Sequence, residues 1–247
     1  MEDALNEQFI VVPDAATLAE TAATTLMTVL AEAIRVRGRA SAAIPGGTTP
    51  RGLFALLAAK PYSSALAWNR VHVFWTDERC VAKNHPDSNY GLAWRLWLSK
   101  GSIPPDNIHR MPGELPPDTA ASAYAEELKG FFGSAPRFDA ILLGIGADGH
   151  TASLFPYTMA TTIADRLVCS VIAPSLTHPR LSLTLPLINK AHNVIFLVSG
   201  HEKAAIVGKL RDPEQRLNFP AGRVQPSDGE LIWIVDQAAA ASKKGYS

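Results

Sequence analysis

Short apolar segments alternate with amphipathic segments along the chain, and this alternation constrains the fold more than any other feature of the sequence. Apolar runs of strand length indicate buried β-strands, whereas apolar residues recurring every three or four positions indicate helices. The sequence therefore predicts an α/β protein in which residues 1–247 form a single domain, a doubly wound, mainly parallel sheet flanked by helices on both faces. The predicted strands are residues 9–12, 41–44, 71–75, 138–144, 181–185, 194–199 and 231–235. The predicted helices are residues 15–37, 50–59, 88–99, 118–132, 202–210 and 236–244.

The composition is that of an ordinary globular protein, with 47% hydrophobic and 19% charged residues. Lysine plus arginine and aspartate plus glutamate both number 23, so we expect neither nucleic acid nor a membrane as a partner. The two cysteines, Cys80 and Cys169, are too few for a disulfide framework or a zinc module. No secretory signal and no apolar stretch near the roughly 18 residues of a membrane helix is visible, which predicts a cytoplasmic protein with reduced thiols.

Polar segments, three of them with glycine, follow four of the predicted strands, where ligands bind in open α/β sheets. The first is residues 45–50 (PGGTTP). Gly46 and Gly47 allow close approach of a ligand to the backbone, and Thr48 and Thr49 add hydroxyl donors. The N–H groups of the helix that begins at Pro50 would favour a phosphate. The alternative interpretation is a tight strand-to-helix turn that binds nothing.

The second segment, residues 76–79 (TDER), follows the strand at 71–75. Asp77, Glu78 and Arg79 come just past a buried strand, which predicts that they lie at the mouth of a site. Arg79 has the planar guanidinium that pairs with phosphate in a bidentate manner. The alternative is a solvated turn in which Asp77 and Arg79 pair with each other.

The third segment, residues 143–153, contains three glycines but not the dinucleotide-binding fingerprint. Its distinctive feature is Asp148-Gly149-His150, which puts two titratable side chains on a glycine-containing turn at a strand end. Histidine suits general base catalysis because its ordinary pKa lies nearest neutrality. The alternative is a structural histidine.

The fourth segment, residues 199–203, places Lys203 in the first turn of a helix. A cation there opposes the helix dipole unless an anion offsets it, so Lys203 indicates a phosphate. Arg180, which precedes the strand at 181–185, is either another cation of the pocket or an exposed residue. The other histidines show no metal-ligand spacing, so no metal site is predicted, and no G-x-S-x-G motif indicates a serine hydrolase.

Four motifs in one order resemble the 6-phosphogluconolactonase family. They are residues 45–50, residues 76–79 followed by 85–91 (HPDSNYG), residues 142–156 (LLGIGADGHTASLFP), and residues 180–207. The likeness extends from residue 44 to residue 241. It implies a Rossmann-like fold shared with glucosamine-6-phosphate deaminases and sugar-phosphate isomerases. It also implies a cofactor-free enzyme of the oxidative pentose phosphate pathway that hydrolyses 6-phospho-D-glucono-1,5-lactone to 6-phosphogluconate.

The residues after His150 separate the lactonases from the deaminases. The deaminases resemble this chain through Asp-Gly-His but then carry an acid where Phe155 stands here. Ring opening and loss of an amine need that additional proton carrier, whereas lactone hydrolysis needs one base and one water. Two departures from the lactonase pattern are Pro45 and Thr48 in place of the commoner serines, and Tyr157 where glycine is usual.

The resemblance and the motifs together predict a division of roles. His150 is the base, Asp148 orients the loop or the imidazole, and Asp77 holds Arg79 or contacts sugar hydroxyls. The predicted phosphate-binding residues are Gly46, Gly47, Thr48, Thr49, Arg79, Lys203 and Arg180. We expect the protein to be a monomer or a weak homodimer. We expect it to bind a small-molecule substrate, a phosphorylated sugar lactone. The alternatives are a sugar-phosphate isomerase or deaminase, and a non-catalytic sugar-phosphate sensor.

Overall fold

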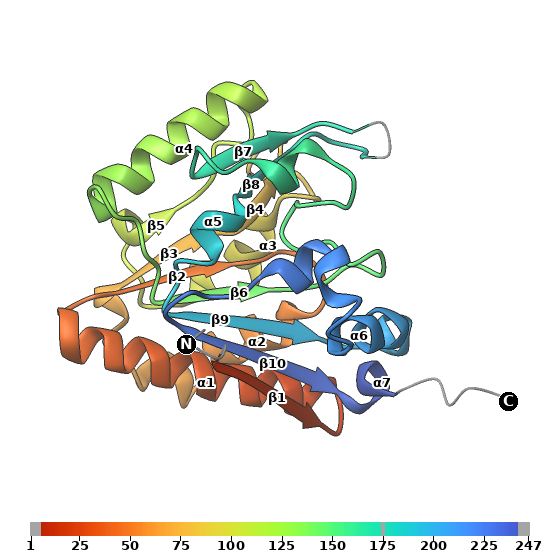
Figure 1. The fold of residues 1–247 in the computed structure, drawn as a ribbon. Coiled ribbons are helices and arrows are strands. Elements are labelled where there is room, and N and C mark those ends of the chain that lie inside the picture. The colour runs from red at the N-terminus through yellow and green to blue at the C-terminus, as the bar shows by residue number, and fades with distance from the viewer. Residues whose placement is uncertain (1–5, 174–175, 242–247) are drawn as a thin grey trace, which may run out of the picture.

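A computed structural model describes residues 6–173 and 176–241. Its main sheet has the strand order β1-β10-β9-β6-β2-β3-β5, and every neighbouring pair is parallel (Figure 1). The strands of this sheet are β1 (Asn6–Val12), β2 (Ala40–Ile44), β3 (Val71–Trp75), β5 (Ile108–His109), β6 (Ala140–Leu143), β9 (Asn193–Val198) and β10 (Glu230–Asp236). The predicted α/β class and parallel sheet are therefore confirmed, and the two-residue β5 is an edge strand that the sequence pattern did not indicate.

The longest helix, α1 (Ala15–Arg37), begins and ends at the residues that the sequence indicates. The Asp14 carboxylate accepts a hydrogen bond from the Thr17 N–H, and Gly38 ends the helix in the left-handed conformation at φ 75°. The buried face of α1 repeats every three or four positions and packs against β2 and β10. Its members include Leu18, Ala22, Leu26, Leu30 and Ala33.

Helices cover the parallel sheet from both sides, as Figure 1 shows for α1 below it and α4 above it. The helices after α1 are α2 (Pro50–Leu57), α3 (Asn89–Leu96), α4 (Pro117–Phe132), α5 (Leu185–Ile188), α6 (Ala204–Arg211) and α7 (Gln237–Ala240), with short 3-10 turns between them. The predicted helix at 236–244 is shorter than expected, and residues 242–244 lie outside the described part of the chain. None of the described helices is long and apolar enough to cross a membrane.

A second, antiparallel sheet corrects two of the sequence predictions. It has the order β4-β8-β7, formed by β4 (Asp77–Arg79), β8 (Arg180–Leu183) and β7 (Val168–Val171). The segment predicted at 181–185 was expected in the parallel sheet, but it belongs to this sheet, which packs under α4. The segment 76–79 was expected to be a polar segment at the mouth of the site, with a solvated turn as the alternative, but most of it forms β4, which continues almost directly from β3. Apolar character predicts a buried strand equally well in either sheet, so the pattern could not separate them.

The order of the parallel strands predicts where a ligand binds. From β2 the chain adds β3 and β5 on one side of the sheet, and later β6, β9 and β10 on the other. The strand order therefore reverses between β2 and β6, which are paired neighbours. In open α/β sheets ligands bind at such a switch point, outside the carboxyl ends of the strands. The two glycine segments at 45–50 and 144–150 both begin there.

Candidate active site

A cleft of about 360 Å³ opens at the switch point, and nine of the ten predicted site residues line it. Its walls come from the segments that follow β2, β6 and β9 and from the first strand of the antiparallel sheet. The predicted residues that line it are Gly46, Gly47, Thr48, Thr49, Asp77, Arg79, His150, Arg180 and Lys203. The exception is Asp148, which stands behind His150 instead of facing the cleft.

His150 and Asp148 form a hydrogen-bonded pair. Nδ1 of His150 lies 2.6 Å from Oδ1 of Asp148, and the His150 backbone N–H donates to the same oxygen at 3.2 Å. A carboxylate accepts but does not donate, so this contact places a proton on Nδ1 and leaves the lone pair of Nε2 free. The pair thus has the orientation of a general base in which a carboxylate contacts one imidazole nitrogen and the other nitrogen can take up a proton.

Burial would raise the pKa of Asp148, but the His150 imidazole and the hydrogen bonds from His150 outweigh it and lower that pKa. Asp148 is consequently ionised near neutral pH and stabilises the imidazolium that forms when Nε2 takes up a proton.

Glycines shape the loop that carries this pair. A Cβ atom on Gly146 would lie 2.1 Å from Nδ1 of His150 and 2.4 Å from Oδ1 of Asp148, so no side chain fits there. Gly149 adopts φ 83°, which favours glycine, and its carbonyl accepts a hydrogen bond from the Ala221 N–H at 3.0 Å. The loop therefore closes tightly around His150 and holds its ring in place.

Two arginines lie next to each other in the wall of the cleft. Arg79 in β4 and Arg180 in β8 are cross-strand partners in the antiparallel register. Nη1 of Arg79 donates to the Asp87 carbonyl at 2.5 Å, and the Nε atoms of both arginines are buried without a hydrogen-bond partner among the described residues. Burial first, and then the neighbouring Arg79 charge, lower the pKa of Arg180. Like charges placed directly opposite are destabilising in a sheet, so this pair suits a site that receives an anion.

Lys203 lines the same cleft as the two arginines. It lies at the end of a 3-10 turn (His201–Lys203) that precedes α6, whereas the sequence predicted it in the first turn of an α-helix. Thr48 and Thr49 also line the cleft, and Thr49 makes no side-chain cap for α2. The described part of the chain gives Lys203 no ion pair, so its ammonium group is open to a ligand.

Asp77 does not pair with Arg79, so the solvated Asp–Arg turn is wrong. Its side chain is buried; Oδ2 accepts from the Ser153 hydroxyl at 2.7 Å and Oδ1 from the Asn89 amide at 3.2 Å. This charge is therefore held by neutral donors from two other segments. It joins the strand β4 to the loop that carries His150.

Asn89 and Ser153 are cleft residues that the sequence analysis did not single out. A Cβ atom on Gly46 would lie 1.8 Å from Oδ1 of Asn89, so the first glycine of residues 45–50 makes room for this amide. The Asn89 Oδ1 is buried and has no hydrogen-bond partner among the described residues. The only signal in the sequence was its place in the HPDSNYG motif.

Glu78 connects residues 76–79 to the HPDSNYG motif at residues 85–91. Its buried carboxylate accepts hydrogen bonds from the backbone N–H groups of Asn89 and Tyr90 and from the Ser88 hydroxyl, at the start of α3. Burial raises the pKa of Glu78 although these hydrogen bonds oppose the shift. Glu78 thus fastens α3 to β4 and keeps Asn89 beside Asp77.

Phe155 packs against His150, with the ring centroids 4.5 Å apart. The position where the deaminases carry an acid is thus an apolar contact of the His150 imidazole. The site holds one histidine–aspartate pair, a cationic wall, and no acid at this point.

Comparison with known proteins agrees with this geometry. Residues 13–233 match the family described as glucosamine-6-phosphate isomerases/6-phosphogluconolactonase. A 6-phosphogluconolactonase of Synechocystis is 45% identical over 228 residues, which cover 90% of this chain and 92% of that protein. One from Nostoc is 40% identical over 94% of this chain and 96% of its own. The solved structure of devB protein superposes with a TM-score of 0.86 at 34% identity, covering 95% of this chain and 98% of that one. The chain therefore belongs to the glucosamine-6-phosphate isomerase/6-phosphogluconolactonase family.

Proposed function

We propose that the protein is a 6-phosphogluconolactonase, which hydrolyses 6-phospho-D-glucono-1,5-lactone to 6-phosphogluconate. One observation carries the proposal: the His150–Asp148 pair opens onto the same cleft as Arg79, Arg180 and Lys203. A base and an anion-binding wall in one cleft suit a substrate that carries a phosphate at one end and a hydrolysable group at the other. The named relatives, which are lactonases, support the same choice.

The cationic wall binds the 6-phosphate. The guanidinium groups of Arg79 and Arg180 offer planar pairs of N–H donors, which match phosphate oxygens in a bidentate manner. Lys203 adds a point charge, and the backbone and hydroxyl groups of residues 46–49 contribute neutral donors. Fixing the phosphate in this wall presents the lactone ring to His150 across the cleft.

Hydrolysis begins when Nε2 of His150 takes a proton from a water molecule whose oxygen forms a bond to the lactone carbonyl carbon. The negative charge of Asp148 stabilises the resulting imidazolium. The tetrahedral intermediate then collapses, the bond between the carbonyl carbon and the ring oxygen breaks, and the imidazolium returns its proton to that oxygen. The step releases the open-chain hydroxy acid and regenerates neutral His150.

Phe155 favours lactone hydrolysis over deamination. Ring opening and amine loss require a second proton carrier beside the histidine, and the Phe155 ring occupies that place. The family as described includes both reactions, so membership alone does not choose between them.

Paired assays on the wild-type protein test the reaction. We expect rapid hydrolysis of freshly prepared 6-phospho-D-glucono-1,5-lactone, corrected for its spontaneous rate, and no ammonia from glucosamine 6-phosphate. Ammonia release without lactone hydrolysis would assign the deaminase activity, and folded protein without either activity would favour a sugar-phosphate sensor.

A further inference from the structure

A second cluster of histidine and carboxylate side chains lies beside the cleft, and the proposed reaction does not use it. His85 and Asp87 come from the loop between β4 and α3, and His178 precedes β8. One ligand-type atom of each residue lies within 4.8 Å of those of the other two. His178 Nε2 is 3.2 Å from Oδ2 of Asp87, and His85 Nδ1 is 3.9 Å from the same oxygen.

We propose that His85, Asp87 and His178 bind Zn²⁺ or a similar divalent metal ion, with water completing the coordination. Two imidazoles and one carboxylate form a donor set that Zn²⁺ accepts, with three protein ligands and an open position. This site is separate from the proposed active site and does not depend on the proposed reaction.

The distances are close to those that coordination requires. Zinc–nitrogen and zinc–oxygen bonds of about 2.0–2.2 Å at tetrahedral angles place neighbouring ligand atoms about 3.3–3.6 Å apart. The contact between His178 and Asp87 is near this spacing already, and that between His85 and Asp87 exceeds it by a few tenths of an ångström. All three side chains are at least partly exposed, so small rotations of the rings bring the atoms together and water can complete the shell.

The ring of His85 is turned toward the cluster. Its Nδ1 accepts a hydrogen bond from the Asp87 backbone N–H at 3.1 Å, so the lone pair of that nitrogen points toward the Asp87 segment, and a metal bound at Nδ1 would replace this hydrogen bond. The rings of His85 and His178 meet edge to face, with centroids 5.3 Å apart.

Hydrogen bonds to backbone carbonyls hold both segments in place before any ion binds. The Asp87 carbonyl accepts from the Arg79 side chain, and the Pro179 carbonyl, next to His178, accepts from the Cys80 N–H at 2.8 Å. Both contacts fasten the ligand-bearing segments to β4 and the residue that follows it. Preorganised ligands of this kind lose little entropy when a metal binds.

Cobalt titration of the full-length protein tests the site, because tetrahedral Co²⁺ absorbs visible light whereas Zn²⁺ does not. We expect one equivalent of Co²⁺ to bind the chelator-treated wild type and to be displaced by one equivalent of Zn²⁺. His178→Ala should weaken binding about 100-fold or more, since even partners of metal ligands contribute about 10–100-fold. Asp87→Asn, which keeps the backbone carbonyl that holds Arg79, should also weaken it.

Two control variants locate the ion. His201→Ala removes an exposed histidine outside the cluster, and His150→Ala removes the imidazole of the histidine–aspartate pair in the cleft. Both should bind Co²⁺ within about 2-fold of wild type, on the scale of ordinary surface substitutions. The proposal is overturned if the wild type shows no saturable binding, if His178→Ala and Asp87→Asn bind normally while circular dichroism shows them folded, or if only His150→Ala loses the ion. If His178→Ala does not fold, His85→Gln replaces it under the same criterion.

Discussion

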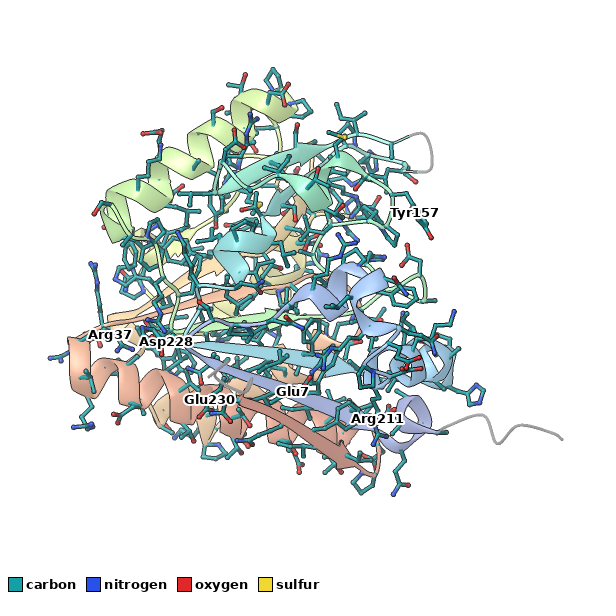
Figure 2. The ribbon with its side chains drawn as sticks, viewed as in Figure 1. Glu7, Arg37, Tyr157, Arg211, Asp228 and Glu230 are labelled. Atoms are coloured by element: carbon teal, nitrogen blue, oxygen red, sulfur yellow. The ribbon has the colours of Figure 1, made fainter. Side chains whose placement is uncertain are left out.

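The arginines at the two ends of the parallel sheet have different partners. At the amino ends of the strands, Arg37 pairs with the buried Asp139, and Nη1 of Arg137 lies 3.1 Å from Oδ2 of Asp228. At the carboxyl ends, Arg79 and Arg180 face each other, and no described carboxylate pairs with either. Figure 2 shows Arg37 and Asp228 on one side of the molecule and Tyr157 on the other, toward which the strands of Figure 1 point.

Under the proposed function, this difference separates residues that stabilise the fold from residues that bind the substrate phosphate. A guanidinium paired with a carboxylate is already satisfied, and its removal leaves the acid unpaired. A guanidinium held only by a backbone carbonyl, beside a like charge, stabilises the fold little and an incoming anion strongly. Variants at the two ends should therefore fail in different assays.

A large effect on kcat should come from crowding the His150–Asp148 pair without removing it. Gly146→Ala places a methyl group where His150 and Asp148 stand, so the imidazole must move. Displacement of a catalytic group by about 1 Å costs about 100-fold in rate, and we expect kcat for lactone hydrolysis to fall by that order. Gly144→Ala is the matched control, because no atom lies within 4 Å of its added methyl group. Equal kcat values in the two variants would show that the position of His150 does not limit the rate.

The two ends of the sheet are compared directly by Arg180→Ala and Arg37→Ala. Loss of a charge-assisted hydrogen bond to the phosphate should raise KM about 10–100-fold in Arg180→Ala and leave the free energy of unfolding nearly unchanged. Arg37→Ala should leave KM unchanged and lower the free energy of unfolding by about 1–3 kcal/mol, because Asp139 loses its ion-pair partner. Steady-state kinetics and urea unfolding measure both quantities. If KM and the free energy of unfolding changed in the same way in both variants, the arginines at the two ends of the sheet would not have different roles.

Among the histidines, His72 lies in the parallel sheet, whereas His150 lines the cleft. Burial first, then the charges of His109 and Arg39, lower the pKa of His72 in β3 from 6.5 to about 4. A histidine whose pKa is lower in the folded state stabilises the fold fully above pH 6.5 and loses that contribution as pH falls from 6.5 toward 4. Wild type should therefore lose on the order of 1 kcal/mol more than His72→Gln between pH 7 and pH 5, after allowance for solvent screening. Urea unfolding at both pH values measures the difference, and equal losses would show that His72 does not carry this acid sensitivity.

The smallest effect concerns backbone strain at the rim of the carboxyl end. Tyr157 adopts φ 62° with its side chain fully exposed, in a position where lactonases usually have glycine. Tyr157→Gly should raise the free energy of unfolding by about 0.5 kcal/mol, because relief of the left-handed strain exceeds the entropy cost of glycine. Met159→Gly, at a nearby exposed residue without positive φ, should lower it by about 0.5–1 kcal/mol. A loss of stability in both variants would mean that the Tyr157 conformation is not strained.

The sequence predicted the parallel sheet because its strands are buried on both faces and its helices carry clear end signals, as at Asp14 and Gly38. The antiparallel sheet escaped prediction because the strand at 180–183 has the same apolar character as a parallel strand. Periodicity reports burial but not the partner of a strand.

The cleft residues were predictable where a glycine or a charge follows a strand, as with His150 and Arg79. Asn89 and Ser153 were not, because their importance comes from contacts with the buried Asp77 across the fold. The cluster of His85, Asp87 and His178 was hidden for the same reason, since 91 positions separate Asp87 from His178. No spacing rule covers such distances, so the expectation of no metal site rested on local patterns alone.

The most direct test of the division of roles in the cleft is steady-state lactone hydrolysis by His150→Ala and Arg79→Ala. His150→Ala should lower kcat by about 10²–10⁴-fold with little change in KM, because it removes the base but not the phosphate site. Arg79→Ala should mainly raise KM. An equal loss of kcat in both variants, or turnover that survives His150→Ala, would contradict the assignment of His150 as the base.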